Sequence, residues 1–264
     1  MNSDNHYRSV HWNGADFCIA AKAGVQAVVF VHGFGEDLHT WDAIWPLLKP
    51  ELAAVRYDLR GFGRSEYSDP QPFNHVDDLF AILDELAIDR CALVGLSMGG
   101  GIALRAALNA PERIQKLVLL SPAITAWDWS SQWRDLWRAV AAKAKAGAMA
   151  DAKALWWQHP LFDSVRNLPV AREVRAGIER YSGREWIKDY QLPALPDLDR
   201  LPTLQVPTLL LTGGQDMADF QLMAELMTAC ASKITRKDFP ELGHLLHLEN
   251  PPLIASEINQ FLVE

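Results

Sequence analysis

A serine between two glycines is the residue in this sequence with the clearest setting for a nucleophile. Ser97 stands between a short apolar run at residues 90–94 and a segment rich in small residues at 100–109. Together with Gly95 and Gly99 it completes the pattern G-x-S-x-G, which is typical of a sharp strand-to-helix turn that exposes a serine hydroxyl. Side chains at the two glycine positions would collide with nearby backbone. The pattern predicts a nucleophilic serine; the alternative is an ordinary glycine-rich turn of an open α/β fold.

A nucleophilic serine needs two partners, and the sequence offers one candidate for each. A free hydroxyl is a weak nucleophile, so a base must take its proton and an acid must orient the base. His244 follows the predicted strand at 234–239, and Asp216 follows the predicted strand at 208–212. Both residues would then lie at the carboxyl edge of a parallel sheet, as Ser97 would. We predict that Ser97, Asp216 and His244 meet there as nucleophile, acid and base.

Two neighbouring residues compete for these roles. His247 lies three positions beyond His244, near the start of the last predicted helix. We favour His244 because a glycine precedes it on a loop, which suits an exposed and adjustable side chain. Asp219 competes with Asp216, but it stands just before the predicted helix at 220–229, where a capping side chain is useful.

A glycine-containing loop also follows the apolar run at 27–31, and it could stabilise negative charge. The oxyanion of a tetrahedral intermediate needs N–H donors. We predict that the backbone N–H groups of Phe34 and Met98 supply them, because the loop after this strand and the residue after the nucleophile are the usual donors. His32 is interpreted as a structural residue that holds the loop.

Most of the chain alternates between strand-like and helix-like patterns. Strands are predicted at residues 7–12, 16–21, 27–31, 53–57, 90–94, 116–120, 208–212 and 234–239. Helices are predicted at residues 41–48, 76–87, 100–109, 220–229 and 253–262. This alternation predicts an α/β fold, with a mostly parallel central sheet and helices on both faces.

The alternation of strand-like and helix-like patterns stops between residues 123 and 203. This segment contains no strand-like run but holds seven of the ten tryptophans. We predict a helical insertion there, within a core domain formed by residues 1–122 and 204–264. The insertion is expected to act as a cap or lid, since ligands bind at the carboxyl edge of such sheets; the alternative is a plain helical subdomain. The side chains expected to line a substrate pocket are Phe34, Met98, Trp127, Trp133, Trp137 and Trp157.

Composition narrows the possible partners. The net charge of −8 argues against a nucleic-acid partner, which would require a basic face. Three cysteines without paired spacing argue against a disulfide framework and a zinc site. Residues 1–8 lack the apolar region of a signal peptide, and no run of about 18 apolar residues predicts a membrane span. A cytoplasmic protein that acts on a small molecule is the default expectation, and the oligomeric state is not predicted.

The ordered motifs resemble the α/β-hydrolase superfamily. The matching segments are 32–35 (HGFG), 58–65 (DLRGFGRS), 95–100 (GLSMGG), 213–216 (GGQD), and 243–244 (GH) with 249–251 (ENP). The resemblance implies a serine hydrolase with a helical cap and no cofactor. The branches with an aspartate nucleophile, such as haloalkane dehalogenases and epoxide hydrolases, are disfavoured because position 97 is serine.

The resemblance leaves several reactions open. We expect a carboxylic ester hydrolase for small to medium, largely apolar substrates. The alternatives are a carbon–carbon bond hydrolase of ring-cleavage products, a lactonase, the menaquinone-pathway synthase, and a non-enzymatic sensor of a small ligand. Leu96 stands where carbon–carbon hydrolases often have asparagine. The basic residues that could bind the carboxylate of a ring-cleavage product are Arg134, Arg138, Arg175 and Arg180, although solvated helix faces are the simpler interpretation.

Overall fold

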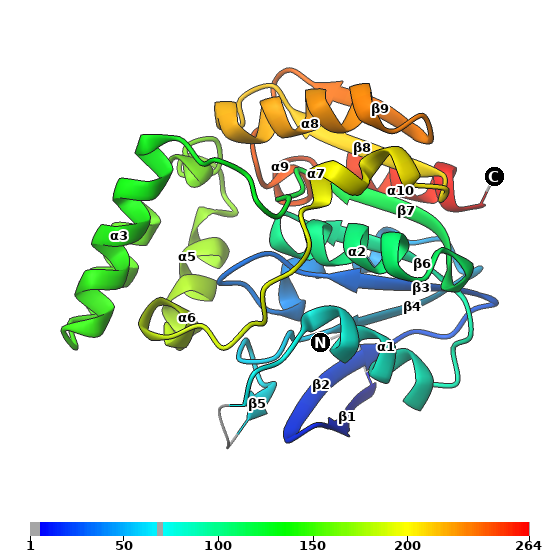
Figure 1. Ribbon diagram of the computed structural model, residues 1–264, viewed down its shortest axis with the longest axis horizontal. Coiled ribbons are helices and arrows are strands. Elements are labelled where there is room, and N and C mark those ends of the chain that lie inside the picture. Colours follow the sequence, from blue (N-terminus) through cyan, green and yellow to red (C-terminus); the bar gives the residue numbers. More distant parts are fainter. Residues whose placement is uncertain (1–5, 68–70, 264) are drawn as a thin grey trace.

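The computed structural model describes residues 6–67 and 71–263, and it has the predicted α/β architecture (Figure 1). A single sheet carries the strands in the order β1-β2-β4-β3-β6-β7-β8-β9, and β5 pairs with β2. The strands are β1 (His6–Trp12), β2 (Ala15–Ala21), β3 (Gln26–Val31), β4 (Leu52–Tyr57), β5 (Glu66–Tyr67), β6 (Cys91–Leu96), β7 (Ile114–Leu120), β8 (Thr208–Gly213) and β9 (Ile234–Phe239). Strands β4, β3, β6, β7, β8 and β9 run parallel to one another. Strand β2 pairs antiparallel with β1, β4 and β5.

Helices cover both faces of the sheet. Those outside the inserted segment are α1 (His75–Glu85), α2 (Met98–Asn109), α8 (Ala218–Cys230), α9 (Leu246–Glu249) and α10 (Pro251–Val263). Short 3-10 turns are η1 (Leu38–Trp41), η2 (Trp45–Leu47) and η3 (Pro111–Arg113). The prediction of one helix over 41–48 was wrong. Two 3-10 turns stand there, with Pro46 at the start of η2, where its missing N–H cannot extend a helix.

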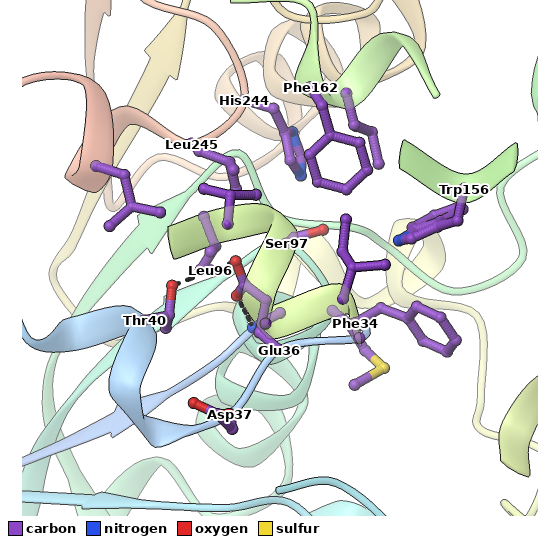
Figure 2. Close-up of a pocket in the computed structure, with 18 of the residues that line it drawn as sticks. Phe34, Glu36, Asp37, Thr40, Leu96, Ser97, Trp156, Phe162, His244 and Leu245 are labelled. Carbon is purple, nitrogen blue, oxygen red and sulfur yellow. Dashed lines mark hydrogen bonds between the residues drawn. The ribbon is translucent and has the colours of Figure 1, made fainter. Parts of the chain in front are cut away.

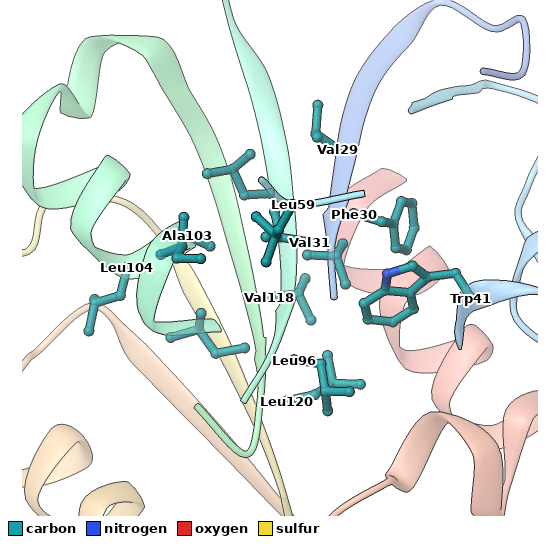
Figure 3. Close-up of a cluster of buried hydrophobic side chains, with 14 of the residues drawn as sticks. Val29, Phe30, Val31, Trp41, Leu59, Leu96, Ala103, Leu104, Val118 and Leu120 are labelled. Carbon is teal, nitrogen blue, oxygen red and sulfur yellow. The ribbon is translucent and has the colours of Figure 1, made fainter. Parts of the chain in front are cut away.

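The central strands are hydrophobic because both of their faces are covered. All six residues of β6 and all six of β8 are buried. Figure 3 shows Phe30 and Trp41 on one side of these strands, and Ala103 and Leu104 of α2 on the other. The rings of Phe30 and Trp41 meet edge to face at 5.2 Å. Burial of each large apolar side chain contributes about 1.5–3 kcal/mol, so these side chains stabilise the sheet that carries the site.

Residues 123–203 lie between β7 and β8 in sequence and are helical. Their elements are α3 (Ser131–Lys145), α4 (Met149–Trp157), η4 (Pro160–Phe162), α5 (Ala171–Arg180), α6 (Arg184–Ile187), α7 (Asp197–Arg200) and η5 (Leu201–Thr203). In Figure 1, α3, α5 and α6 stand to one side of the sheet. Of these residues, Gln191 forms an isolated parallel bridge with Phe73.

The chain enters and leaves this helical segment at one point. The backbone N–H of Thr125 donates to Oδ2 of Asp197 at 2.7 Å, and the N–H of Asp197 donates to the Thr125 hydroxyl at 3.1 Å. Arg105 of α2 also donates to Oδ2 of the buried Asp197, at 3.1 Å. Thr125 and Asp197 therefore form a neck, which is fastened to the core through α2.

Candidate active site

Ser97 occupies a strained turn between β6 and α2. Its backbone angles are φ +51° and ψ −117°, a region that a residue with a Cβ adopts at a cost of roughly 1–3 kcal/mol. A Cβ at Gly95 would lie 2.5 Å from the carbonyl oxygen of Gly99, and one at Gly99 would lie 2.3 Å from that of Val31. Both flanking glycines are thus required by close backbone approaches, which fix the direction of the serine side chain.

The loops after β8 and β9 bring Asp216 and His244 together. Nδ1 of His244 and Oδ2 of Asp216 are 2.9 Å apart, and both side chains are buried. The other carboxylate oxygen of Asp216 accepts the N–H of Met217 at 2.7 Å. A Cβ at Gly213 would lie 2.1 Å from the carbonyl oxygen of Gly243, so the two loops pack backbone against backbone. With Nδ1 bonded to the carboxylate, Nε2 of His244 is the nitrogen available to take a proton.

Ser97 and His244 line one cavity of about 740 Å³. Figure 2 shows the hydroxyl of Ser97 and the imidazole of His244 directed into the same space. The structure thus brings the three residues selected from the sequence to one rim of the sheet. The arrangement can transfer a proton from a hydroxyl to an imidazole that a carboxylate orients.

The two competing residues have other partners. His247 is fully buried, and its Nε2 lies 2.7 Å from the hydroxyl of Thr40. Burial lowers the pKa of His247 to about 3, so this imidazole stays neutral. Asp219 lies in the first turn of α8 and accepts the indole N–H of Trp127 at 3.0 Å and the backbone N–H of Ser130 at 2.9 Å. Burial opposes ionisation of Asp219, but the hydrogen bonds from Ser130 and Trp127, together with the positive charge of Arg134, lower its pKa below the ordinary value.

The loop at residues 32–35 packs against the turn that carries Ser97. An ideal Cβ on Gly33 would lie 3.5 Å from Cβ of Ser97. His32 is fully buried; its Nδ1 bonds the carbonyl oxygen of Gly33 at 2.8 Å, and its Nε2 accepts the N–H of Leu59 at 2.9 Å. Burial lowers the pKa of His32, which favours the neutral ring. Its two hydrogen bonds hold the loop in place. Phe34 and Met98, the predicted oxyanion donors, both border the cavity.

Glu36 is a cavity residue that the sequence reasoning missed. Its Oε2 accepts the N–H of Gly33 at 2.9 Å, and its Oε1 accepts the hydroxyl of Thr40 at 3.2 Å (Figure 2). Burial raises the pKa of Glu36 to about 7, although both hydrogen bonds oppose the rise. Its place directly after the HGFG loop was the available signal.

Aromatic side chains form much of the cavity wall: Phe34, Trp129, Trp133, Trp137, Trp156 and Phe220. Trp133 and Trp137, both expected there, are among them. The placement of Trp127 and Trp157 in the wall needs correction. Trp127 is held by Asp219, and the ring of Trp157 packs against Phe162 at 5.4 Å; neither borders the cavity.

Helical phase explains these tryptophan positions. Trp133 and Trp137 are four residues apart on α3, so they share one face of the helix, and their ring centroids are 6.3 Å apart. Trp129 lies in the loop before α3, and its ring stacks on Trp133 at 4.0 Å. Trp156 and Trp157 are consecutive on α4, so their side chains point about 100° apart. The indole nitrogen of Trp156 points toward the cavity in Figure 2, and it has no hydrogen-bond partner among the described residues.

The four arginines named as possible carboxylate ligands are paired or lie elsewhere. Arg134 pairs with Asp128 at 2.7 Å and Arg138 with Asp135 at 2.9 Å, both on the surface. Arg175 does not border the cavity. Arg180 does, but its guanidinium pairs with Asp37 at 2.9 Å.

Comparison with known proteins places the chain in a family. Residues 26–251 match the family model of the alpha/beta hydrolase fold, and the chain belongs to that family. A 2-hydroxymuconate semialdehyde hydrolase from Pseudomonas sp. (strain CF600) is 28% identical, over 97% of this chain and 90% of the relative. The 3-oxoadipate enol-lactonase 1 of Acinetobacter baylyi is 25% identical, over 85% of this chain and 84% of the relative. A crystal structure of a hydrolase from Pseudomonas aeruginosa PA01 matches with a TM-score of 0.82 and 25% identity over all of both chains.

No helix within residues 6–67 and 71–263 is both long enough and apolar enough to cross a membrane. In the same part of the chain, no three side chains of His, Cys, Asp or Glu are grouped so as to hold a metal ion.

Proposed function

We propose that this protein hydrolyses carboxylic esters through an acyl-enzyme formed on Ser97. The observation that carries the proposal is the 2.9 Å contact between Nδ1 of His244 and Asp216, at a cavity that Ser97 also lines. Membership of the alpha/beta hydrolase fold family supports hydrolase activity in general.

In the proposed reaction, Nε2 of His244 takes the proton of Ser97 as the hydroxyl oxygen attacks the ester carbonyl. Asp216 keeps the imidazole in the tautomer with a proton on Nδ1 and stabilises its charged form. The backbone N–H groups of Phe34 and Met98 hold the oxyanion, an effect worth roughly 3–4 kcal/mol per donor in comparable sites. His244 then protonates the leaving alcohol, and a water molecule activated by the same imidazole releases the acid.

The walls of the cavity support small to medium, largely apolar substrates. A volume of about 740 Å³ lies within the range of drug-sized ligand sites. Rings of Phe34, Trp133 and Trp137 offer apolar surface close to Ser97, and the rings of Phe34 and Trp137 are 4.9 Å apart. We further propose that residues 123–203 act as a cap, since α3, α4 and α5 contribute walls of this cavity.

Carbon–carbon bond hydrolysis is the second candidate. It is favoured by the likeness to a 2-hydroxymuconate semialdehyde hydrolase along 97% of the chain. A lactonase is favoured in the same way by the enol-lactonase relative. We place both behind ester hydrolysis because Arg180, the arginine that borders the cavity, is already paired with Asp37 and leaves no free guanidinium there for a substrate carboxylate.

The test is an activity profile with p-nitrophenyl esters of increasing acyl length, alongside a vinylogous diketone and an enol-lactone. Ester turnover that Ser97→Ala abolishes supports the proposal. Turnover of the diketone or the lactone alone would assign the second candidate instead. A single slow turnover with tightly retained product would indicate a ligand sensor, and a covalent phosphonate bound to Ser97 would identify the nucleophile directly.

A further inference from the structure

The cavity has an acidic side that the proposed hydrolysis does not use. Glu36 borders the cavity close to the nucleophile: an ideal Cβ on Gly33 would lie 2.9 Å from Oε2 of Glu36 and 3.5 Å from Cβ of Ser97. Figure 2 shows the carboxylate of Glu36 in the space next to Ser97. Its two hydrogen bonds, from the Gly33 N–H and the Thr40 hydroxyl, come from uncharged donors.

In the part of the chain that the structure describes, no Lys or Arg side chain forms an ion pair with this carboxylate. Arg180 is the only Lys or Arg among the described residues that line the cavity, and Asp37 is its partner at 2.9 Å. Asp42, also in the lining, pairs with His39 and Arg56. Glu173 adds a further carboxylate from α5. The cavity therefore carries more negative than positive charge.

A half-buried carboxylate without a countercharge is costly, and a cation in the cavity would remove that cost. Desolvation is the main reason that the pKa of Glu36 rises to about 7; Asp37 adds to the rise, and His244 opposes it. The stacked rings of Trp133 and Trp137 stand in the same lining. Aromatic faces attract desolvated cations, quaternary ammonium groups among them.

We propose that Glu36 makes the enzyme select its substrates by charge: esters that carry a quaternary ammonium group are preferred over uncharged esters of the same shape, and anionic esters are rejected. This inference rests on the ester hydrolysis proposed above, and it names the substrate class of that same site. Glu36 acts on the substrate as a specificity residue and takes no part in the proton transfers.

The test uses three p-nitrophenyl esters that differ in charge and little in shape. They are the esters of 4-(trimethylammonio)butanoate, of 5,5-dimethylhexanoate and of monoanionic glutarate. At pH 8 we expect kcat/KM of the cationic ester to exceed that of the neutral ester roughly tenfold, and the anionic ester to be the poorest substrate. Hydrolysis of the neutral ester tests the proposed function; the ratio between esters tests the charge selection.

Glu36→Gln keeps one oxygen that can accept the N–H of Gly33, and its amide N–H can donate to the hydroxyl of Thr40, but it removes the charge. We expect this variant to lower the ratio between the cationic and the neutral ester to about twofold. Glu112→Gln, an exposed change in η3, is the matched control and keeps the ratio of the unaltered enzyme.

Two further measurements report on the same preference in other ways. In the unaltered enzyme, the ratio between the cationic and the neutral ester is expected to rise from pH 6 to pH 8 as Glu36 ionises, since burial raises the pKa of this carboxyl to about 7. Binding of choline against 3,3-dimethylbutan-1-ol, followed by tryptophan fluorescence, measures the same preference in Ser97→Ala. A preference that Glu36→Gln removes, in either assay, supports the proposal. Equal values for cation and neutral analogue in both assays, at both pH values, would overturn it.

Discussion

The carboxylate of Asp219 accepts the indole N–H of Trp127 at 3.0 Å and so joins α8 of the core to the inserted helices. The same oxygen accepts the backbone N–H of Ser130, which precedes α3. Asp219 lies three residues after Asp216, the carboxylate that holds His244. Two aspartates on one short segment therefore have separate tasks: one faces the imidazole, and the other anchors the start of α3.

Substitution of the two aspartates separates these tasks. Asp216→Asn is expected to lower kcat by roughly 10³–10⁴-fold, because an amide favours the wrong imidazole tautomer. Asp219→Asn is expected to keep kcat within about threefold while lowering the free energy of unfolding by roughly 1–3 kcal/mol, through weaker hydrogen bonds to Trp127 and Ser130. Steady-state kinetics and urea unfolding measure the two effects. The reverse ranking in kcat would make Asp219 the acid.

The turn at Ser97 makes a prediction about stability. Gly99→Ala places a Cβ 2.3 Å from the carbonyl oxygen of Val31, so we expect a loss of about 3 kcal/mol or more, or failure to fold. Gly177→Ala is the matched control within helix α5, where the nearest atom to a new Cβ is 3.8 Å away. That change is expected to stabilise by about 0.5–1 kcal/mol. Thermal unfolding of both variants checks the contrast, and equal melting temperatures would contradict it.

His159 makes a prediction about acid sensitivity. It is fully buried, and burial lowers its pKa to about 3 in the folded protein, whereas an unfolded chain titrates near 6.5. The unfolded state therefore binds the extra proton, and stability falls as the pH drops from about 6.5 toward 3. His159→Asn, which can still accept the N–H of Leu161, should remove about 1.4 kcal/mol per pH unit from that slope. Urea unfolding at pH 7, 6 and 5 measures the slope; parallel curves for the two proteins would exclude this contribution.

The corrected tryptophan positions predict the acyl preference. Trp133→Ala enlarges the cavity, so long acyl chains should gain roughly tenfold in kcat/KM relative to acetate. Trp157→Ala removes a ring that packs against Phe162 outside the cavity, and the ranking of acyl chains should stay the same. The ester series proposed above provides the readout. A shift caused by Trp157→Ala alone would restore the assignment made from the sequence.

The parts of the site that follow from short-range rules could be predicted from the sequence. Ser97 could be found because its turn requires glycines at fixed positions. Asp216 and His244 could be placed at the same edge because each follows a strand of a parallel sheet. The roles of these residues in catalysis stay predictions until they are tested.

The parts that depend on helical phase or on long-range packing could not be predicted in the same way. The choice between Trp156 and Trp157 depends on where α4 begins, and no capping side chain marks that start. The spacing of Trp133 and Trp137 did carry a usable signal of one helical face. The surroundings of Glu36 arise because Thr40 and His247, 207 positions apart, meet beside it.

The neck at Thr125 and Asp197 has a consequence for how this enzyme can diversify. The chain leaves the core at Thr125 and returns at Asp197, and these two residues are hydrogen-bonded to each other. The residues between them therefore form an insertion whose two ends are adjacent. Such an insertion can be exchanged, lengthened or shortened during evolution without a change in the register of β7 and β8. New ligand preferences can thus arise in one stretch of the gene while the bond-breaking machinery is inherited intact.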